Sequence, residues 1–157
     1  MTSTTGSDRA VESAASRPSL LYVVKQVELA ARAQMDELLK PAGITALQYT
    51  ALTVLRRRDG LSSAQLARNS FVTAQSMADM ITALERRGLI ARRRDPGNRR
   101  ALLISLTDAG HELLAAHDEA MDALEERMLT GLTARQRRDL EVYLNRCRTA
   151  LSDLPPH

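Results

Sequence analysis

Apolar residues recur every three or four positions along most of this chain, which is the spacing of helices that bury one side. The first such run lies between Ser19 and Lys40 and is closed by Pro41 and Gly43, so it predicts one long helix. Later runs predict helices over 46–58, over 64–69, from a cap at Thr73 to Gly88, and after Thr107 and Thr133. Three of these starts carry a capping box, in which a Ser or Thr is followed three residues later by Gln: Thr45, Ser62 and Thr133.

Between residues 89 and 106 the pattern changes from helical spacing to alternation. Leu102, Ile104 and Leu106 alternate with the residues between them, and the preceding segment Asp95-Pro96-Gly97-Asn98 has the composition of a turn, so a β-hairpin is expected. A short helix, a turn, a longer helix and a hairpin in succession predict a winged helix-turn-helix over residues 45–106. The expected fold class is therefore mainly α with a small β-hairpin wing.

The rest of the chain divides into a tail and a second helical region. Residues 1–17 are rich in Ser, Thr, Gly and Ala without an apolar period, and we expect a flexible N-terminal tail. Residues 18–44 and 107–154 are expected to form a helical region whose last two helices carry apolar residues at heptad spacing, a pattern that does not fit a solvated helix. These residues are Leu114, His117, Met121, Leu124 and Met128, then Leu140, Leu144, Cys147 and Leu151.

Composition narrows the function classes. A chain of 157 residues with 44% apolar and 26% charged residues is typical of one folded domain. Only 3% of the residues are aromatic and none is Trp, which excludes an RNA reader that stacks bases on aromatic rings. The single Cys excludes an intramolecular disulfide and a cysteine-cluster metal site. We expect a cytoplasmic protein without a membrane span, because no apolar run approaches about 18–20 residues and no signal peptide is visible.

Charge is distributed unevenly along the chain. Residues 86–106 hold seven Arg and one Asp, a net charge of +6, whereas residues 107–128 hold seven acidic residues and one Arg, a net charge of −6. The chain as a whole carries a net charge of only +3, so the basic charge is concentrated in one patch. Such a patch fits binding to a specific polyanionic partner better than nonspecific adhesion. Together with the winged helix, it predicts binding to double-stranded DNA.

The second helix of the helix-turn-helix is expected to lie in the major groove. Its outward residues Gln75, Ser76 and Asp79 are candidates for base edges, since Gln pairs with adenine and Asp accepts a hydrogen bond from cytosine or repels phosphate. Thr73 or Ser76 is expected to hold a phosphate at the helix start, and Ser62 is a further candidate at the start of the preceding helix. In the wing, Arg99 or Arg100 is expected to enter the minor groove, and Arg92 and Arg94 to reach phosphates.

Several segments resemble the multiple antibiotic resistance regulator (MarR) family. They are Ser62 to Ala67, Leu84 to Ile90, and the wing from Asp95 through Leu106, Thr107 and Gly110. The wing signature is the most specific of them, with Asn98 at a place where the family has Asp. An acid there usually steadies the wing Arg, so either Asp95 substitutes for it or the wing is looser.

The resemblance implies a homodimer assembled from the first and last two helices, and a repressor of a pseudo-palindromic operator that a small ligand releases. It also implies an effector site, often for anionic aromatic compounds, near the first two helices. The polar and aromatic candidates there are Tyr22, Lys25, Gln26 and Tyr49.

The sequence is also compatible with functions other than DNA binding. A winged helix also serves as a protein-protein interaction module, which stays open as an alternative. Cys147 could respond to oxidants, although its apolar heptad position favours a buried packing residue. His111 and His117 lie six residues apart, roughly 240° around a helix, so they cannot hold one metal ion within one chain. A structural or dimer-bridging role is left for them, and with it the alternative of a metal-responsive regulator. No enzyme, cofactor or metal motif is present, so none of these functions is expected.

Overall fold

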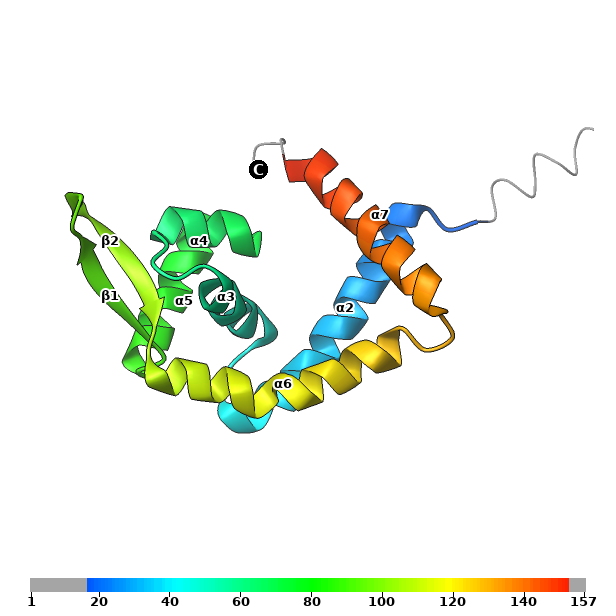
Figure 1. Cartoon of the computed structure of the whole chain (residues 1–157), viewed down its shortest axis with the longest axis horizontal. Coiled ribbons are helices and arrows are strands. Elements are labelled where there is room, and N and C mark those ends of the chain that lie inside the picture. The colour runs from blue at the N-terminus through cyan, green and yellow to red at the C-terminus, as the bar shows by residue number, and fades with distance from the viewer. Residues whose placement is uncertain (1–16, 153–157) are drawn as a thin grey trace, which may run out of the picture.

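The computed structural model describes residues 17–152; the expected N-terminal tail lies, up to residue 16, outside the described residues. Within residues 17–152, six helices, one 3-10 turn and one hairpin follow one another (Figure 1). They are α2 (Leu20–Leu39), η1 (Lys40–Ala42), α3 (Ala46–Arg57), α4 (Ser63–Ser70), α5 (Ala74–Arg86), β1 (Ile90–Asp95), β2 (Asn98–Leu106), α6 (Asp108–Met128) and α7 (Ala134–Ser152). This mainly α fold with one β-hairpin confirms the expected fold class.

The predicted capping boxes explain where the helices begin. The Thr45 hydroxyl accepts from the Gln48 amide, and the Gln48 side chain accepts from the Thr45 amide in return. The same reciprocal pair forms between Ser62 and Gln65 at the start of α4. Because each box satisfies two backbone amides that a helix leaves unpaired, the sequence locates these starts to within one residue.

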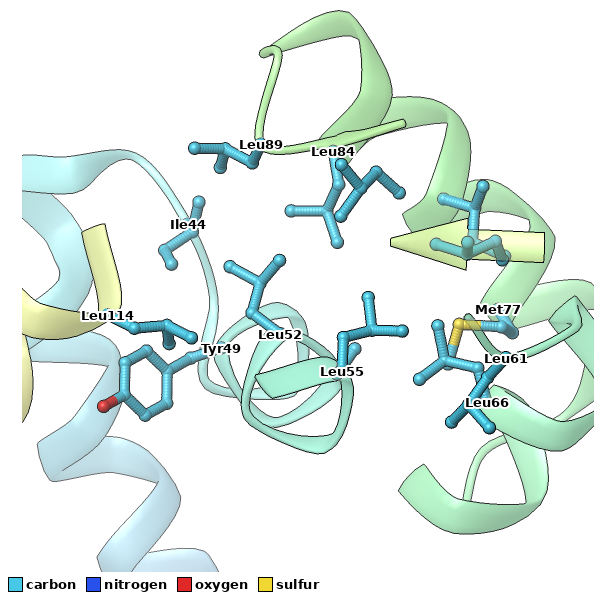
Figure 2. Packing of buried hydrophobic residues seen from close by; sticks show 14 of the residues in the cluster. Ile44, Tyr49, Leu52, Leu55, Leu61, Leu66, Met77, Leu84, Leu89 and Leu114 are labelled. Atoms are coloured by element: carbon cyan, nitrogen blue, oxygen red, sulfur yellow. The ribbon is translucent and has the colours of Figure 1, made fainter. Parts of the chain in front are cut away.

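The core lies inside the winged unit, which spans α3 to β2. Its buried side chains come from α3, α4, α5 and the hairpin, and Leu114 of α6 closes it on one side (Figure 2). The largest buried members include Leu52, Leu55, Leu66, Met77, Leu84 and Ile104. α5 therefore has one side packed on the core, and its opposite side is exposed along its length.

The hairpin is longer at its tip than the sequence predicts. β1 and β2 pair antiparallel from Ile90 with Leu106 to Asp95 with Asn98, with a register shift between Arg94 and Asp95. Leu61, just before α4, adds one bridge to Ile104 through two backbone hydrogen bonds. The base of the wing is thereby attached to the helix-turn-helix, and its tip projects away from the core (Figure 1).

The helices outside the winged unit have apolar sides that the chain itself does not cover. In α2 only Leu39 is buried, and in α7 no residue is buried. Cys147 is exposed, so the prediction of a buried packing residue is wrong for the single chain. The reason is that this chain alone buries no residue of α7, so the heptad position of Cys147 stays at the surface. In the described part of the chain, no helix is long and apolar enough to span a bilayer.

Candidate nucleic-acid interface

The helix-turn-helix consists of α4, a tight turn and α5. Phe71 makes the turn with φ of 55°, in the left-handed region, and its amide closes the end of α4. Thr73 then caps α5, because its hydroxyl accepts from the Ser76 amide at 3.1 Å. The Thr73 hydroxyl also donates to the Ser76 Oγ at 3.0 Å, so these two predicted phosphate contacts form one polar group at the start of α5.

The outward side of α5 presents the base-reading residues that the sequence predicts. Gln75, Ser76 and Asp79 are all exposed, and Met77 and Ile81 between them are buried. The Gln75 Nε2 lies 3.4 Å from the Asp79 Oδ1, one turn along the helix. Ser62 lies at the start of the neighbouring α4, where its hydroxyl caps the helix.

The three arginines on β1 have partners within the chain. Arg92 pairs with Glu85 at the end of α5, with 3.0 Å between Nε and Oε2. Arg93 contacts Asp59 at 3.3 Å and the Ser105 hydroxyl at 3.1 Å. Arg94 donates to the Arg99 carbonyl oxygen at 3.1 Å. Glu85 and Asp59 help to fix the wing and were not predicted. Each lies on a different element from its arginine, so no periodic spacing in the sequence indicates the pair.

The tip of the wing presents two arginines to solvent. Arg99 and Arg100 are exposed, and neither guanidinium pairs with an acidic group among residues 17–152. Asn98 accepts a hydrogen bond from the Arg100 backbone amide at 3.2 Å, and Asp95 accepts one from the Gly97 amide at 2.8 Å. Both side chains stabilise the turn, and Asp95 does not take the role of an acid that holds the Arg100 side chain.

A second feature is a cavity of about 510 Å³ between α2 and α6. Most of its lining is apolar, and Tyr49 of α3 contributes one wall. Arg127 of α6 donates a hydrogen bond to Gln34 of α2 at 3.0 Å between two further lining residues. The other lining residues are Val27, Ala30, Ala31, Met35, Met121, Leu124, Glu125 and Met128.

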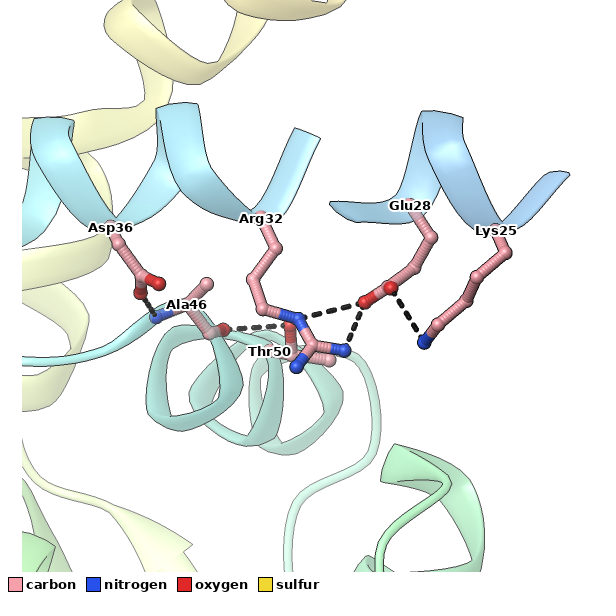
Figure 3. A network of polar contacts seen from close by, with 6 residues as sticks. All are labelled: Lys25, Glu28, Arg32, Asp36, Ala46 and Thr50. Atoms are coloured by element: carbon pink, nitrogen blue, oxygen red, sulfur yellow. Dashed lines mark hydrogen bonds and ion pairs between the residues drawn. The ribbon is translucent and has the colours of Figure 1, made fainter. Parts of the chain in front are cut away.

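Of the four predicted effector contacts, the structure places one at this cavity. Tyr49 is 6% exposed, and burial, followed by the charge of Asp118, raises the pKa of its phenol. Tyr22, Lys25 and Gln26 lie on the exposed first turns of α2, where Gln26 donates to the Tyr22 hydroxyl. Lys25 pairs with Glu28, which Arg32 also contacts (Figure 3). Hydrogen bonds from Arg32 and then Lys25 lower the pKa of Glu28.

Two polar links join the winged unit to the neighbouring helices. Arg87, at the end of α5, donates to the Ala42 and Gly43 carbonyl oxygens at 2.5 and 2.6 Å. Asp36 of α2 accepts from the Ala46 amide at 2.6 Å and so caps the first turn of α3 (Figure 3). The end of α5 and the start of α3 are thus attached to the segment that leaves α2.

The structure brings no further metal-binding groups to the histidines within the described residues. In the described range, no three His, Cys, Asp or Glu side chains come together as a metal site would require. His117 directs its Nδ1 to the Leu113 carbonyl oxygen at 2.8 Å, within its own helix.

Known proteins resemble this chain in sequence. The sequence model that describes the MarR family matches residues 44–102. An HTH-type transcriptional repressor of Mycobacterium tuberculosis is 33% identical to this chain over 125 residues, which are 80% of this chain and 90% of that protein.

Solved structures share the fold. A MepR–DNA complex from S. aureus matches with a TM-score of 0.76 and 23% identity, covering 86% of this chain and 100% of the other. BpsR of Bordetella bronchiseptica, whose DNA binding is regulated by 6-hydroxynicotinic acid, matches with a TM-score of 0.74 and 23% identity. That match covers 87% of this chain and 95% of BpsR.

Proposed function

Because this chain belongs to the MarR family of transcriptional regulators, we propose that it represses transcription by binding an operator in double-stranded DNA. The observation that carries the proposal is the placement of Arg99 and Arg100, which have no acidic partner among residues 17–152, on a wing beside the exposed side of α5. A helix of this width fits the major groove, and an arginine on a narrow loop fits the electronegative minor groove next to it.

The residues divide according to the part of the duplex that they meet. Gln75, Ser76 and Asp79 face the base edges, and Arg99 or Arg100 enters the minor groove. Thr73 and Ser62 bind backbone phosphates at the starts of their helices. Arg92 and Arg94 lie at the rim of this surface, where their partners Glu85 and the Arg99 carbonyl hold them in place beside the DNA.

The active form is a homodimer. Residues 18–44 and 107–154 supply its interface, which is supported by the uncovered apolar side chains of α2 and α7, such as Leu21, Val24, Tyr143 and Leu144. Two α5 helices related by a two-fold axis reach successive major grooves about 34 Å apart. The operator is therefore pseudo-palindromic. The acidic α6 lies away from the phosphates, which would repel it.

The effector site is the cavity between α2 and α6. It borders the winged unit through Tyr49 and the helical region through α2, so a bound ligand alters how these two parts are joined. The regulation of DNA binding by 6-hydroxynicotinic acid in BpsR supports control of this chain by a small ligand. A ligand releases the operator only if it binds more tightly to the form that fits the DNA poorly.

The protein carries out no catalysis and works in the cytoplasm, where the DNA is. Both statements are supported by its relatives, which are transcriptional regulators.

The test is the salt dependence of DNA binding. Affinity for a duplex that contains the protein's own upstream intergenic palindrome is measured between roughly 50 and 200 mM salt. A steep linear fall of log affinity with log salt is expected, because several arginines displace counterions from phosphates. A protein-interaction module would bind no duplex even at low salt.

A further inference from the structure

One acidic side chain on the DNA-facing side of α5 has no cationic partner. α5 contains two acids, and Glu85 is paired with Arg92 at 3.0 Å. Asp79 is exposed in the middle of the same surface, and no Lys or Arg among residues 17–152 lies within ion-pair distance of it. A carboxylate at this position repels the phosphates of any bound duplex, so it lowers the affinity for DNA irrespective of sequence.

The contact that Asp79 does make is with Gln75. The Gln75 Nε2 lies 3.4 Å from the Asp79 Oδ1, and neither side chain has another side-chain partner in the described range. An ionised carboxylate only accepts hydrogen bonds, whereas a carboxamide has a donating and an accepting end. The Gln75 amide therefore turns its nitrogen toward Asp79, because the reverse orientation would place two acceptors against each other.

This orientation determines which base Gln75 can bind. One of the two amide hydrogens is directed to Asp79, which leaves the carbonyl oxygen and the other hydrogen along the free edge of the amide. Adenine presents N7 as acceptor and the N6 amino group as donor in the major groove, which matches that edge. Guanine presents two acceptors, N7 and O6, and O6 would meet the amide oxygen.

We infer that Asp79 is a positioning residue that orients the Gln75 amide for adenine and rejects guanine at that base pair. Asp79 thereby lowers the affinity for DNA of any sequence and raises the discrimination between sequences. This inference rests on the proposed function, since it requires that α5 read the major groove.

The experiment is selection of duplexes from a randomised library by the full-length protein, followed by sequencing. Three variants are compared with the wild type: Gln75→Ala, Asp79→Ala and Asp79→Asn. Thr82→Ala is the matched control, because Thr82 is exposed on the same helix and its hydroxyl bonds to the Ala78 carbonyl oxygen. The three side chains that are changed, Gln75, Asp79 and Thr82, are all exposed, and thermal unfolding checks that each variant is folded.

Gln75→Ala and Asp79→Ala are expected to lose the preference for adenine at the same base pair, by about five- to 150-fold each. Asp79→Ala is also expected to bind random duplexes about two- to fivefold more tightly, because an anion facing the phosphates is gone. Gln75→Ala has no such gain. Asp79→Asn keeps an oxygen that accepts from Gln75, so it should retain more of the preference than Asp79→Ala while still binding random DNA more tightly.

Two results would overturn the inference. If Asp79→Ala lost its preference at a base pair other than the one affected by Gln75→Ala, Asp79 would read its own base. If Asp79→Ala kept the adenine preference in full, the contact with Gln75 would have no role in recognition. Failure of the wild type to enrich any sequence would instead reject the proposed function, and the inference with it.

Discussion

Arg56 and Asp118 form a bidentate ion pair in which the Arg56 Nη1 lies 2.9 Å from both carboxylate oxygens. The two residues are 62 positions apart, and their contact joins α3 of the winged unit to α6. It also pairs one cation of α3 with one anion of the acidic α6. The pair is part of the joint between the two halves of the chain, close to Tyr49 and the cavity.

Breaking this pair is expected to cost little stability. The side chains are 35% and 45% exposed, so water screens their attraction, and the pair contributes about 0.2–1 kcal/mol. Asp118→Asn should therefore lower the free energy of unfolding by no more than about 1 kcal/mol, measured by urea titration at fixed protein concentration. Asp122→Asn on the same helix is the control. A loss above about 3 kcal/mol would mean that the pair behaves as a buried one.

Removing the wing arginine is expected to weaken all DNA binding, whatever the sequence. Arg100→Ala should reduce affinity for operator and random duplex by similar factors and lower the salt slope by about 1, because one phosphate-neutralising charge is lost. Gln75→Ala should cost roughly 1–3 kcal/mol at one base pair and leave the salt slope unchanged. Arg138→Ala on α7, outside the winged unit, serves as control. Identical behaviour of Arg100→Ala and Gln75→Ala would contradict the assigned roles.

Gly110 marks a close approach that tolerates no side chain. A Cβ at this position would overlap the Leu89 carbonyl oxygen and lie 3.0 Å from the Leu106 side chain. Since both neighbours belong to the base of the wing, Gly110→Ala has to push α6 away from it. We expect a loss of about 2 kcal/mol or more, which corresponds to a fall in Tm of about 4–8 °C.

The matched control is Gly97→Ala in the turn of the wing. A Cβ there would have only the Asp95 carboxylate as a neighbour, at an ordinary 3.5 Å. Its Tm should stay within about 2 °C of the wild type. Equal Tm losses in the two variants, measured by differential scanning calorimetry, would show that the close packing of Gly110 is not the cause.

The elements of the winged unit were predictable because their signals are local. Capping boxes such as Thr45 with Gln48 locate helix starts, and the Pro-Gly pair locates the turn of the wing, since each acts within four residues. Cys147 shows the limit of such reasoning. Its heptad position correctly identifies an apolar side of α7, but whether that side is buried depends on a surface outside the single chain.

The candidate site was predictable in its residue types and less so in its connections. Periodicity alone places Gln75 and Asp79 on one exposed side of α5, where the structure has them. The pairing of Arg92 with Glu85, and of Arg93 with Asp59, depends on how a strand crosses a helix, which no spacing rule contains. The same holds for the cavity, because two helices from opposite ends of the chain form it.

High pH is expected to destabilise the protein through Tyr49. Burial, and then the nearby Asp118 carboxylate, raise the pKa of this phenol above its value in the unfolded chain, about 10. The folded state therefore favours the protonated phenol, and the stability this provides is complete below pH 10 and is lost as the pH rises through the folded pKa. Above about pH 10, up to the folded pKa, the free energy of unfolding should fall more steeply in the wild type than in Tyr49→Phe, by up to about 1.4 kcal/mol per pH unit.

The control for that comparison is Tyr22→Phe, which removes a hydroxyl from the exposed first turns of α2, outside the lining of the cavity. Urea titrations at a series of pH values give the slopes. If Tyr49→Phe and the wild type had parallel pH profiles, the Tyr49 phenol would not be coupled to folding.

Filling the cavity between α2 and α6 is expected to separate ligand binding from DNA binding. Ala31 lies on α2 and lines the cavity, so Ala31→Trp places an indole in the space of about 510 Å³ that a drug-sized molecule would use. Ala33→Trp is the matched control, because Ala33 is exposed on the same helix and does not line the cavity.

Binding of the apolar fluorescent anion anilinonaphthalene sulfonate should weaken at least about tenfold in Ala31→Trp, because the indole occupies the apolar surface that the dye would bury. Affinity for the operator without ligand should stay within about threefold of the wild type, because α5 and the wing are unchanged. Equal loss of dye binding in both variants would locate the dye on the exposed side of α2. That result would contradict the assignment of the cavity as the effector site.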